Sequence, residues 1–168
     1  MNPKFTSTIE HKRKTLALED TSTKTYQQLC LMNNIKCFKA SDEQDIKNHI
    51  DFFMEGESVD VKGMKDSSCA GNILIEIKNV NGRSGWCNNA KHPEWIAFYF
   101  GAFFLHVYKK DLYRLTNTLC DLENKVPSAL ACLYKGYTRK NRKDLLTMVK
   151  LQDVLNTCNH LFLANKIK

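Results

Sequence analysis

The sequence predicts an α/β fold in which a central, mostly antiparallel or mixed β-sheet is flanked by helices. Residues 48–79 contain three short runs of alternating apolar residues, rich in β-branched and aromatic side chains. A turn at Glu55-Gly56-Glu57 and a polar loop over residues 65–71 separate these runs, as in an antiparallel meander. Residues 94–108 are the most apolar stretch, and Gly101-Ala102 divides it into two strand-like runs. We expect a buried hairpin there that continues the sheet.

The remaining elements follow from local signals along the chain. A helix is expected from Ser22, with Ser22 or Thr23 as its N-cap, to about residues 33–34. Residues 35–39 alternate like a strand, and Ser41 precedes acidic residues as at a helix start, so that Glu43 or Asp45 could approach a site on the sheet. Further helices are predicted over residues 109–119, over 127–133 and from 151, with a strand over 145–149. We expect the first helix on one side of the sheet and the later helices on the other.

Composition indicates one globular unit with a polyanionic partner. Of 168 residues, 43% are hydrophobic and 26% charged, which fits a single α/β domain over residues 22–168 after a flexible basic arm over residues 1–21. The formal net charge of +7 favours nucleic acid or an anionic membrane surface, which charge alone does not separate. No run of about 18 apolar residues occurs that could span a membrane.

The cysteines and the N-terminus indicate a reducing compartment. Seven cysteines are scattered without zinc-ligand spacing, and the first residues lack the apolar core of a signal peptide. We therefore expect reduced thiols, several of them in the core, in a cytoplasmic protein.

Acidic residues occupy strand positions where they are normally depleted. If the first hairpin turns about Glu55-Gly56, Asp51 lies opposite Asp60. If the second turns about Ser68, Asp60 lies opposite Glu76, and three carboxylates form a row. Opposed like charges destabilise a sheet unless a cation lies between them, and hard oxygen ligands select Mg²⁺ or Mn²⁺. The alternative is that these acids and their neighbouring lysines pair on a solvent-exposed sheet face.

The same residues resemble the signature of the PD-(D/E)XK nuclease superfamily. Asp51 followed by Asp60-Val61-Lys62 fits its D…(D/E)xK pattern, and Asp60 followed by Glu76-Ile77-Lys78 fits it with a longer gap. The pattern departs from the family at Ile50, which stands where proline usually precedes the first acid. The run HIDF…SVDVKG…IEIKNVNGRSGW is also similar to small, mostly phage-encoded proteins. The resemblance implies a restriction-endonuclease-like core and, for a phage protein, location in the host cytoplasm.

The resemblance also implies roles for these residues. Asp51, Asp60 and Glu76 would hold one or two divalent ions. Lys62 would orient or deprotonate the attacking water, or neutralise charge in the transition state, with Lys78 as its substitute in the second frame. We prefer the first frame, because its hairpin is short and its register better determined.

Two basic, aromatic segments are candidates for contact with DNA. The loop after the meander is rich in Gly and Asn, and a second segment over residues 134–144 combines tyrosines with five basic residues. Such loops contact phosphates and stack on bases. The predicted contacts are Arg83, Trp86, Lys91, Tyr137, Arg139, Lys140, Arg142 and Lys143. Alternatively, Trp86 closes one edge of the core and the charge run is a solvated loop.

Together these features favour a Mg²⁺- or Mn²⁺-dependent endonuclease that acts on DNA. We expect no membrane partner, and a homodimer is a candidate assembly. The alternative is a non-catalytic module on a nuclease-like fold that binds nucleic acid or a protein, for example as a phage-encoded inhibitor. Metal dependence separates the two classes.

Overall fold

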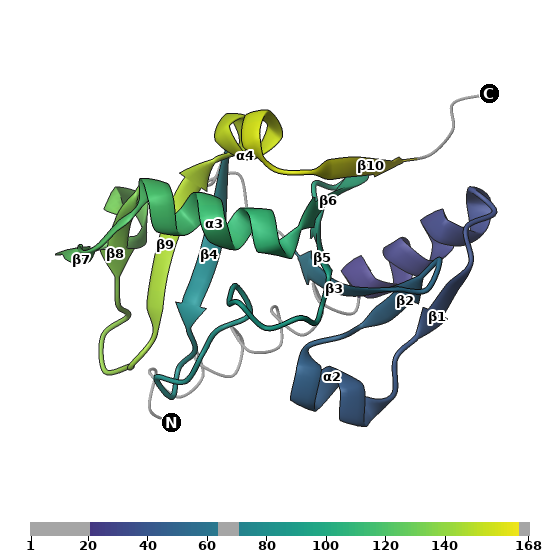
Figure 1. Cartoon of the computed structure of the whole chain (residues 1–168), viewed down its shortest axis with the longest axis horizontal. Helices are drawn as coiled ribbons and strands as arrows, with labels where there is room; N and C mark the ends of the chain where they lie inside the picture. The colour runs from purple at the N-terminus through teal and green to yellow at the C-terminus, as the bar shows by residue number, and fades with distance from the viewer. Residues whose placement is uncertain (1–20, 64–70, 165–168) are drawn as a thin grey trace, which may run out of the picture.

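The computed structural model describes residues 21–63 and 71–164. The predicted arm, apart from residue 21, and nearly all of the predicted 65–71 loop lie outside these residues. The described chain folds into two mixed β-sheets with four helices around them (Figure 1). The α/β class is therefore confirmed, whereas the expectation of one central sheet is wrong.

The helices mostly match their local sequence signals, but the helix predicted over residues 127–133 is wrong, because only a short 3₁₀ helix forms there. The described helices cover residues 21–32, α2 (Asp42–Asn48), α3 (Lys109–Leu119) and α4 (Leu151–Thr157), with a short 3₁₀ helix η2 (Ala129–Ala131). The first helix is already helical at residue 21, so the predicted N-cap at Ser22 or Thr23 is wrong, but its end before Asn33 is confirmed. At α2, the Ser41 side chain accepts a hydrogen bond from Gln44 N and completes a capping box.

The six-stranded sheet has the order β1-β2-β3-β5-β6-β10. Its strands are β1 (Cys37–Lys39), β2 (Phe52–Met54), β3 (Glu57–Gly63), β5 (Trp95–Tyr99), β6 (Phe103–Tyr108) and β10 (His160–Ala164). The β2–β3 hairpin has the predicted register, with Phe52 opposite Val59, and the β5–β6 hairpin is also confirmed. Strands β3 and β5 are parallel, whereas all other neighbours in this sheet are antiparallel.

The four-stranded sheet has the order β4-β9-β8-β7. Its strands are β4 (Asn72–Lys78), β7 (Asp121–Val126), β8 (Lys135–Tyr137) and β9 (Leu145–Lys150). Strand β4 therefore pairs with β9 and not with β3, which corrects the second half of the predicted meander. Asp60 lies opposite Ile96 of β5, and Glu76 lies opposite Leu146 of β9, so the three carboxylates do not form one row across a sheet.

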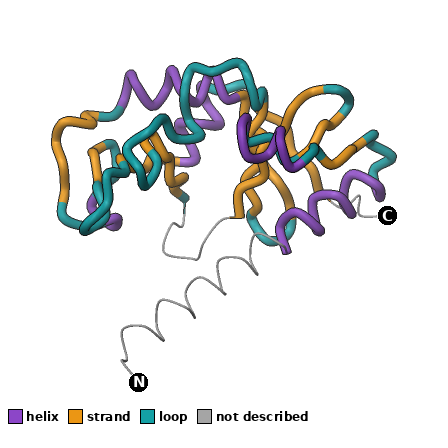
Figure 2. The backbone as a smooth tube through the Cα atoms, turned by 90° about the horizontal axis from the view of Figure 1, so that it is seen from below, coloured by secondary structure: helices purple, strands orange, loops and turns teal. Residues whose placement is uncertain are grey.

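Two hydrophobic clusters hold these layers together, one on each face of the six-stranded sheet. The helix over residues 21–32 packs its Tyr26, Leu29 and Cys30 onto the face that carries Val59 and Phe104. On the other face, Ile96 and Leu105 pack against side chains from α3, α4 and the four-stranded sheet. The predicted placement of the first helix opposite the later ones is confirmed, and Figure 2 shows the two sheets in separate halves of the molecule.

A buried histidine links the first helix to the six-stranded sheet. His106 is fully buried, its Nε2 lies 2.8 Å from Tyr26 Oη, and its Nδ1 has no hydrogen-bond partner among the described residues. Four of the described cysteines (Cys30, Cys87, Cys132 and Cys158) are buried, and the described cysteines form no disulfide. Among the described helices, none has the length and apolar character needed to cross a membrane.

Candidate active site

The candidate site lies at the open end of the β2–β3 hairpin. Val59 and Val61 pack against the first helix, so Asp60 and Lys62 extend from the opposite face of β3, toward the four-stranded sheet. Asp51 precedes β2 and continues the hairpin, since its N–H donates to Val59 O over 2.9 Å. Its carboxylate Oδ2 in turn accepts a hydrogen bond of 2.6 Å from Val61 N. The hairpin therefore brings Asp51 beside Asp60, as the first signature frame predicts.

The Asp60 carboxylate is almost completely buried. Its Oδ1 lies 2.7 Å from Lys62 Nζ, and the two side chains are 3% and 30% exposed, respectively. No hydrogen-bond partner in the described residues reaches Asp60 Oδ2. Burial raises the pKa of Asp60, and the charge of Lys62 opposes that rise. The adjacent Asp51 carboxyl also lowers the pKa of Asp60 through a hydrogen bond, so a shared proton or a bound cation between the two carboxyls would relieve the cost of this buried oxygen.

The two carboxyl groups perturb each other. Burial raises the pKa of Asp51 to about 7, and the neighbouring Asp60 charge contributes to the increase, while the hydrogen bond from Val61 opposes it. The charge of Asp45 in α2 also raises the pKa of both groups, so this residue approaches the site as anticipated. Two carboxyls that resist joint ionisation form a place for a proton or a cation.

Nearby acidic side chains and an aromatic ring both favour the charged form of Lys62. Burial lowers its pKa, but the Asp60 carboxylate, with Asp51 and Glu76, raises it above the ordinary value. Its Nζ also lies 5.7 Å from the centre of the Trp86 ring. Trp86 itself packs edge-on against Phe98 of the core, at 6.0 Å between ring centres. This contact is the core-edge role anticipated for Trp86, and its stacking on a base stays a prediction.

Glu76 reaches the site from the other sheet. It lies at an irregularity in β4, on the edge of the four-stranded sheet, and is half-buried. Burial raises its pKa, while the charges of Lys62, Arg139 and His49 oppose that rise. Within the described residues, no three His, Cys, Asp or Glu side chains form a group that could hold a metal ion. Glu76 thus interacts with the site through charge, and its role as a third ligand stays a prediction.

The loop after β4 folds back along the edge of that strand and positions Glu76. Gly85 N donates to Ile77 O and Cys87 N donates to Glu76 O, over 2.8 and 3.1 Å. A Cβ atom at Gly85 would lie 2.5 Å from Glu76 O, so only glycine permits this approach. Lys78 forms part of the same region but is exposed and pairs with Leu145, away from the Asp51–Asp60 pair.

The predicted DNA contacts fall into three places. Loops 79–83 and 139–143 lie side by side, because Lys143 N donates to Val80 O over 3.3 Å. Four exposed cations lie in these two loops: Arg83, Lys140, Arg142 and Lys143. Tyr137 lies in β8 opposite Leu146, and Lys91 is exposed beside the start of α3. Arg139 differs from the others, since its N–H and Nε–H both donate to the buried carboxylate of Asp144.

Three residues near the carboxylates carried no clear signal in the sequence. His49 ends α2 in the left-handed conformation, at φ 55°, and its charge acts on Glu76. Arg139 was anticipated only as a DNA contact, yet its charge also acts on Glu76. Lys109 begins α3 and is buried with 2% exposure; burial lowers its pKa, and the charges of Cys87 and Asp60 oppose that decrease. Comparisons with protein-family models, curated proteins and solved structures find no match to this chain.

Proposed function

We propose that the chain is a divalent-metal-dependent nuclease that hydrolyses phosphodiester bonds in DNA. The observation that carries this proposal is the Asp51–Asp60–Lys62 arrangement, in which two adjacent carboxyls and one lysine meet at the end of a single hairpin. Perturbed acids paired with a lysine are frequent at active sites. The arrangement matches the first of the two signature frames, and on this ground we also propose a PD-(D/E)XK-like core.

The donor set suits Mg²⁺ or Mn²⁺. Asp60 Oδ2 has no partner in the described residues, and Asp51 is the adjacent carboxylate. Mg²⁺ commonly binds proteins through one or two carboxylates and takes its other ligands from water and substrate phosphates. Asp51 and Asp60 would hold the ion, with Glu76 as a candidate third ligand. When bound, such an ion polarises the phosphate and lowers the pKa of the attacking water.

Lys62 supplies positive charge in this proposal. Because Asp60 and the other nearby acids raise the pKa of Lys62, its ammonium stays protonated at neutral pH. It is therefore suited to stabilise negative charge on the phosphate and to orient water, and less suited to accept a proton. Of the roles considered for this lysine, charge stabilisation is the one that its surroundings favour.

The basic loops are proposed to hold the DNA backbone. Loops 79–83 and 139–143 present exposed cations side by side, and Arg139 links them electrostatically to Glu76. Contacts of lysine and arginine with phosphates give affinity without sequence preference. This grip would position the strand so that one phosphate reaches the carboxylate pair.

A cleavage assay on plasmid and short duplex DNA tests the proposal. We expect wild-type protein to cut DNA with Mg²⁺ or Mn²⁺, and a chelator or Asp60→Asn to abolish cutting. Glu123→Gln alters an exposed acid on β7 and serves as the matched control. Binding in gel shifts should persist in Asp60→Asn.

A non-catalytic binding module is the second candidate, because no three-ligand metal group occurs among the described residues. This candidate predicts that the wild type with metal, the wild type with chelator, Asp60→Asn and Glu123→Gln all bind DNA and that none of them cuts it. That outcome would overturn the nuclease proposal.

A further inference from the structure

A polar cavity lies beside the start of α3. It has a volume of about 290 Å³, and the residues that matter for its chemistry are Asn88, Asn89, Lys91, Glu94, Lys109 and Lys110. This volume is close to the lower end of the range for small-ligand pockets, so the cavity suits a small group and not a large cofactor. It adjoins the candidate active site, because Asp60 and Ile96 are opposed and Glu94 lies two residues before Ile96.

The lining carries an excess of positive charge. Lys91 and Lys110 contribute two exposed cations and Lys109 a buried amine whose pKa is lowered by burial, while Glu94 contributes one anion. The Glu94 carboxylate is already engaged, since its Oε2 accepts hydrogen bonds of 3.1 and 3.2 Å from Ser58 N and Oγ. Asn88 and Asn89 add neutral polar groups to the lining, although Asn88 Nδ2 already donates one hydrogen to Gly85 O. A cavity with this lining favours an anionic ligand.

Lys109 is the residue that indicates a ligand most directly. Its side chain is buried, and Nζ donates to His92 O over 2.7 Å. An ammonium group has three hydrogens, and among the described residues only this one acceptor is provided. Buried lysines are rare unless they are paired. An anion in the cavity would supply the missing acceptors.

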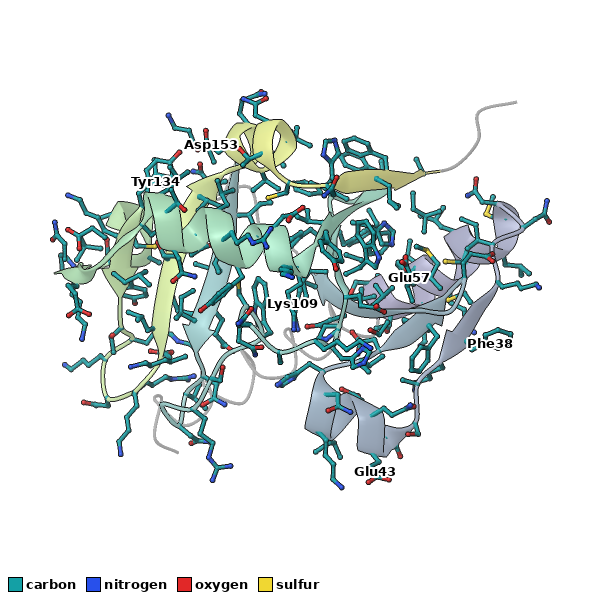
Figure 3. All side chains as sticks on the ribbon, viewed as in Figure 1. Phe38, Glu43, Glu57, Lys109, Tyr134 and Asp153 are labelled. Atoms are coloured by element: carbon teal, nitrogen blue, oxygen red, sulfur yellow. The ribbon has the colours of Figure 1, made fainter. Side chains whose placement is uncertain are left out.

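The N-terminus of α3 also borders this cavity. The helix has 11 residues, and its N-cap Tyr108 makes no side-chain capping bond. The Lys109 N–H already donates to Glu94 O over 2.9 Å, so only the N–H groups that follow it, together with the helix dipole, favour a negative group there. In Figure 3, Lys109 lies near the centre of the molecule, at the start of α3.

We propose that this cavity binds the phosphomonoester group of a nucleotide, either at the end of a DNA strand or in a free mononucleotide. A phosphomonoester dianion offers several acceptor oxygens to the lysines, more than a phosphodiester does. The assignment deepens the proposed function and rests on it for the identity of the substrate. It would make the protein prefer DNA that carries a terminal phosphate next to the cleaved position.

Binding is tested by titrating metal-free protein, in the presence of chelator, with thymidine 5′-monophosphate, inorganic phosphate and thymidine. We expect saturable binding of the two phosphates and none of thymidine. Lys109→Met should weaken binding at least about tenfold, and the exposed Lys110→Gln about threefold, since charge-assisted hydrogen bonds are lost. Lys125→Gln, on exposed β7, is the control and should bind as wild type. If Lys109→Met does not fold, Lys110→Gln and Lys91→Gln carry the test.

Two results overturn the proposal: absence of phosphate binding by the wild type, or equal affinity in the lysine variants. Oligonucleotides with and without a 5′-phosphate then distinguish the source. Preference for the phosphorylated strand assigns a strand end, and equal binding together with thymidine monophosphate binding assigns a free nucleotide. Because the titrations contain chelator, they do not depend on cleavage. Phosphate binding without any DNA cleavage would contradict the proposed function alone.

Discussion

Lys62 Nζ lies 2.7 Å from Asp60 Oδ1, although the Asp60 side chain is only 3% exposed. Taking both charges out of water is unfavourable, and an apolar pair of similar size is often as stable or more stable. The neighbouring Asp51 increases the cost, because its charge repels that of Asp60. Stability alone therefore does not explain this cluster, which is why its role in the proposed function needs a direct test.

Removal of the lysine should destabilise the fold. Lys62→Met leaves Asp60 buried beside Asp51 without a cation, and we expect the free energy of unfolding at pH 8 to fall by about 3 kcal/mol. Asp60→Asn combined with Lys62→Met should recover most of this loss. Urea unfolding measures all three proteins. Lys47→Met breaks the exposed Lys47–Glu43 pair and should change stability by less than about 0.5 kcal/mol. Equal losses at Lys47 and Lys62 would contradict the buried-pair account.

Gly85→Ala should disturb the edge of β4. The added Cβ would lie 2.5 Å from Glu76 O, which no side-chain movement can relieve because the clash is with the backbone. We expect a loss of about 2 kcal/mol in thermal or urea unfolding, together with weaker metal-dependent activity, because Glu76 is displaced. Ser84→Ala, at the exposed neighbouring position, is the control. A Gly85→Ala protein as stable as the control would show that the loop does not pack against Glu76 as described.

The stability of the metal-free protein should depend on the charge of Asp51. Because its folded pKa is raised to about 7, the folded state binds the proton more tightly than the unfolded chain. Stability should therefore decrease as pH rises from about 4 to about 7. Asp51→Asn keeps an acceptor for Val61 N and removes the charge, so we expect it to be about 2 kcal/mol more stable than wild type at pH 8. Asp42→Asn, at an exposed position, should follow the wild-type profile.

Chelator must be present in these measurements, since a bound divalent ion competes with the proton at the same carboxyls. A wild-type profile without any decrease between pH 4 and 7 would show that Asp51 is ionised in the folded protein at low pH.

Substitution of the two arginines of loop 139–143 should distinguish an effect on DNA binding from an effect on fold stability. Arg142 is exposed, so Arg142→Gln should weaken DNA binding a few-fold, reduce its salt dependence by about one ion, and leave stability unchanged. Arg139→Gln should in addition cost about 3 kcal/mol of stability, because Asp144 is buried and loses its charged partner. Fluorescence anisotropy at several salt concentrations and urea unfolding measure the two effects. Identical behaviour of the two variants would contradict this division.

Local elements were predictable from the sequence because their signals are local. Glu55 and Gly56 both adopt positive φ, at 51° and 93°, so the two-residue turn fixes the β2–β3 register and with it the Asp51–Asp60 pair. The Ser41 capping box and the Gly101 turn specify α2 and the β5–β6 hairpin in the same way.

The prediction of a second hairpin was wrong because the pairing of β4 is not local. Strand β4 pairs with β9, about 70 residues later in the chain, and a pairing over this distance has no tight turn whose residues would indicate it in the sequence. Glu76 consequently approaches the site from a second sheet, and the pattern of apolar residues in the strands does not predict this approach. Strands β7, β8 and β10 were missed, because β7 is polar and exposed, β8 lies in the basic segment interpreted as a loop, and β10 is a mostly exposed edge strand. The burial of Lys109 could not be predicted from the sequence either, since lysine is usually a surface residue.

The measurement that tests the central claim most directly is the single-turnover rate of DNA cleavage by Asp51→Asn and Lys78→Gln. Asp51 belongs only to the hairpin frame, and Lys78 only to the alternative frame through Glu76. We predict cleavage by the wild type with Mg²⁺ or Mn²⁺, a loss of at least about 100-fold in Asp51→Asn, and a rate within about threefold of wild type in Lys78→Gln. Full activity of Asp51→Asn with an inactive Lys78→Gln, or no cleavage by the wild type, would contradict the assignment.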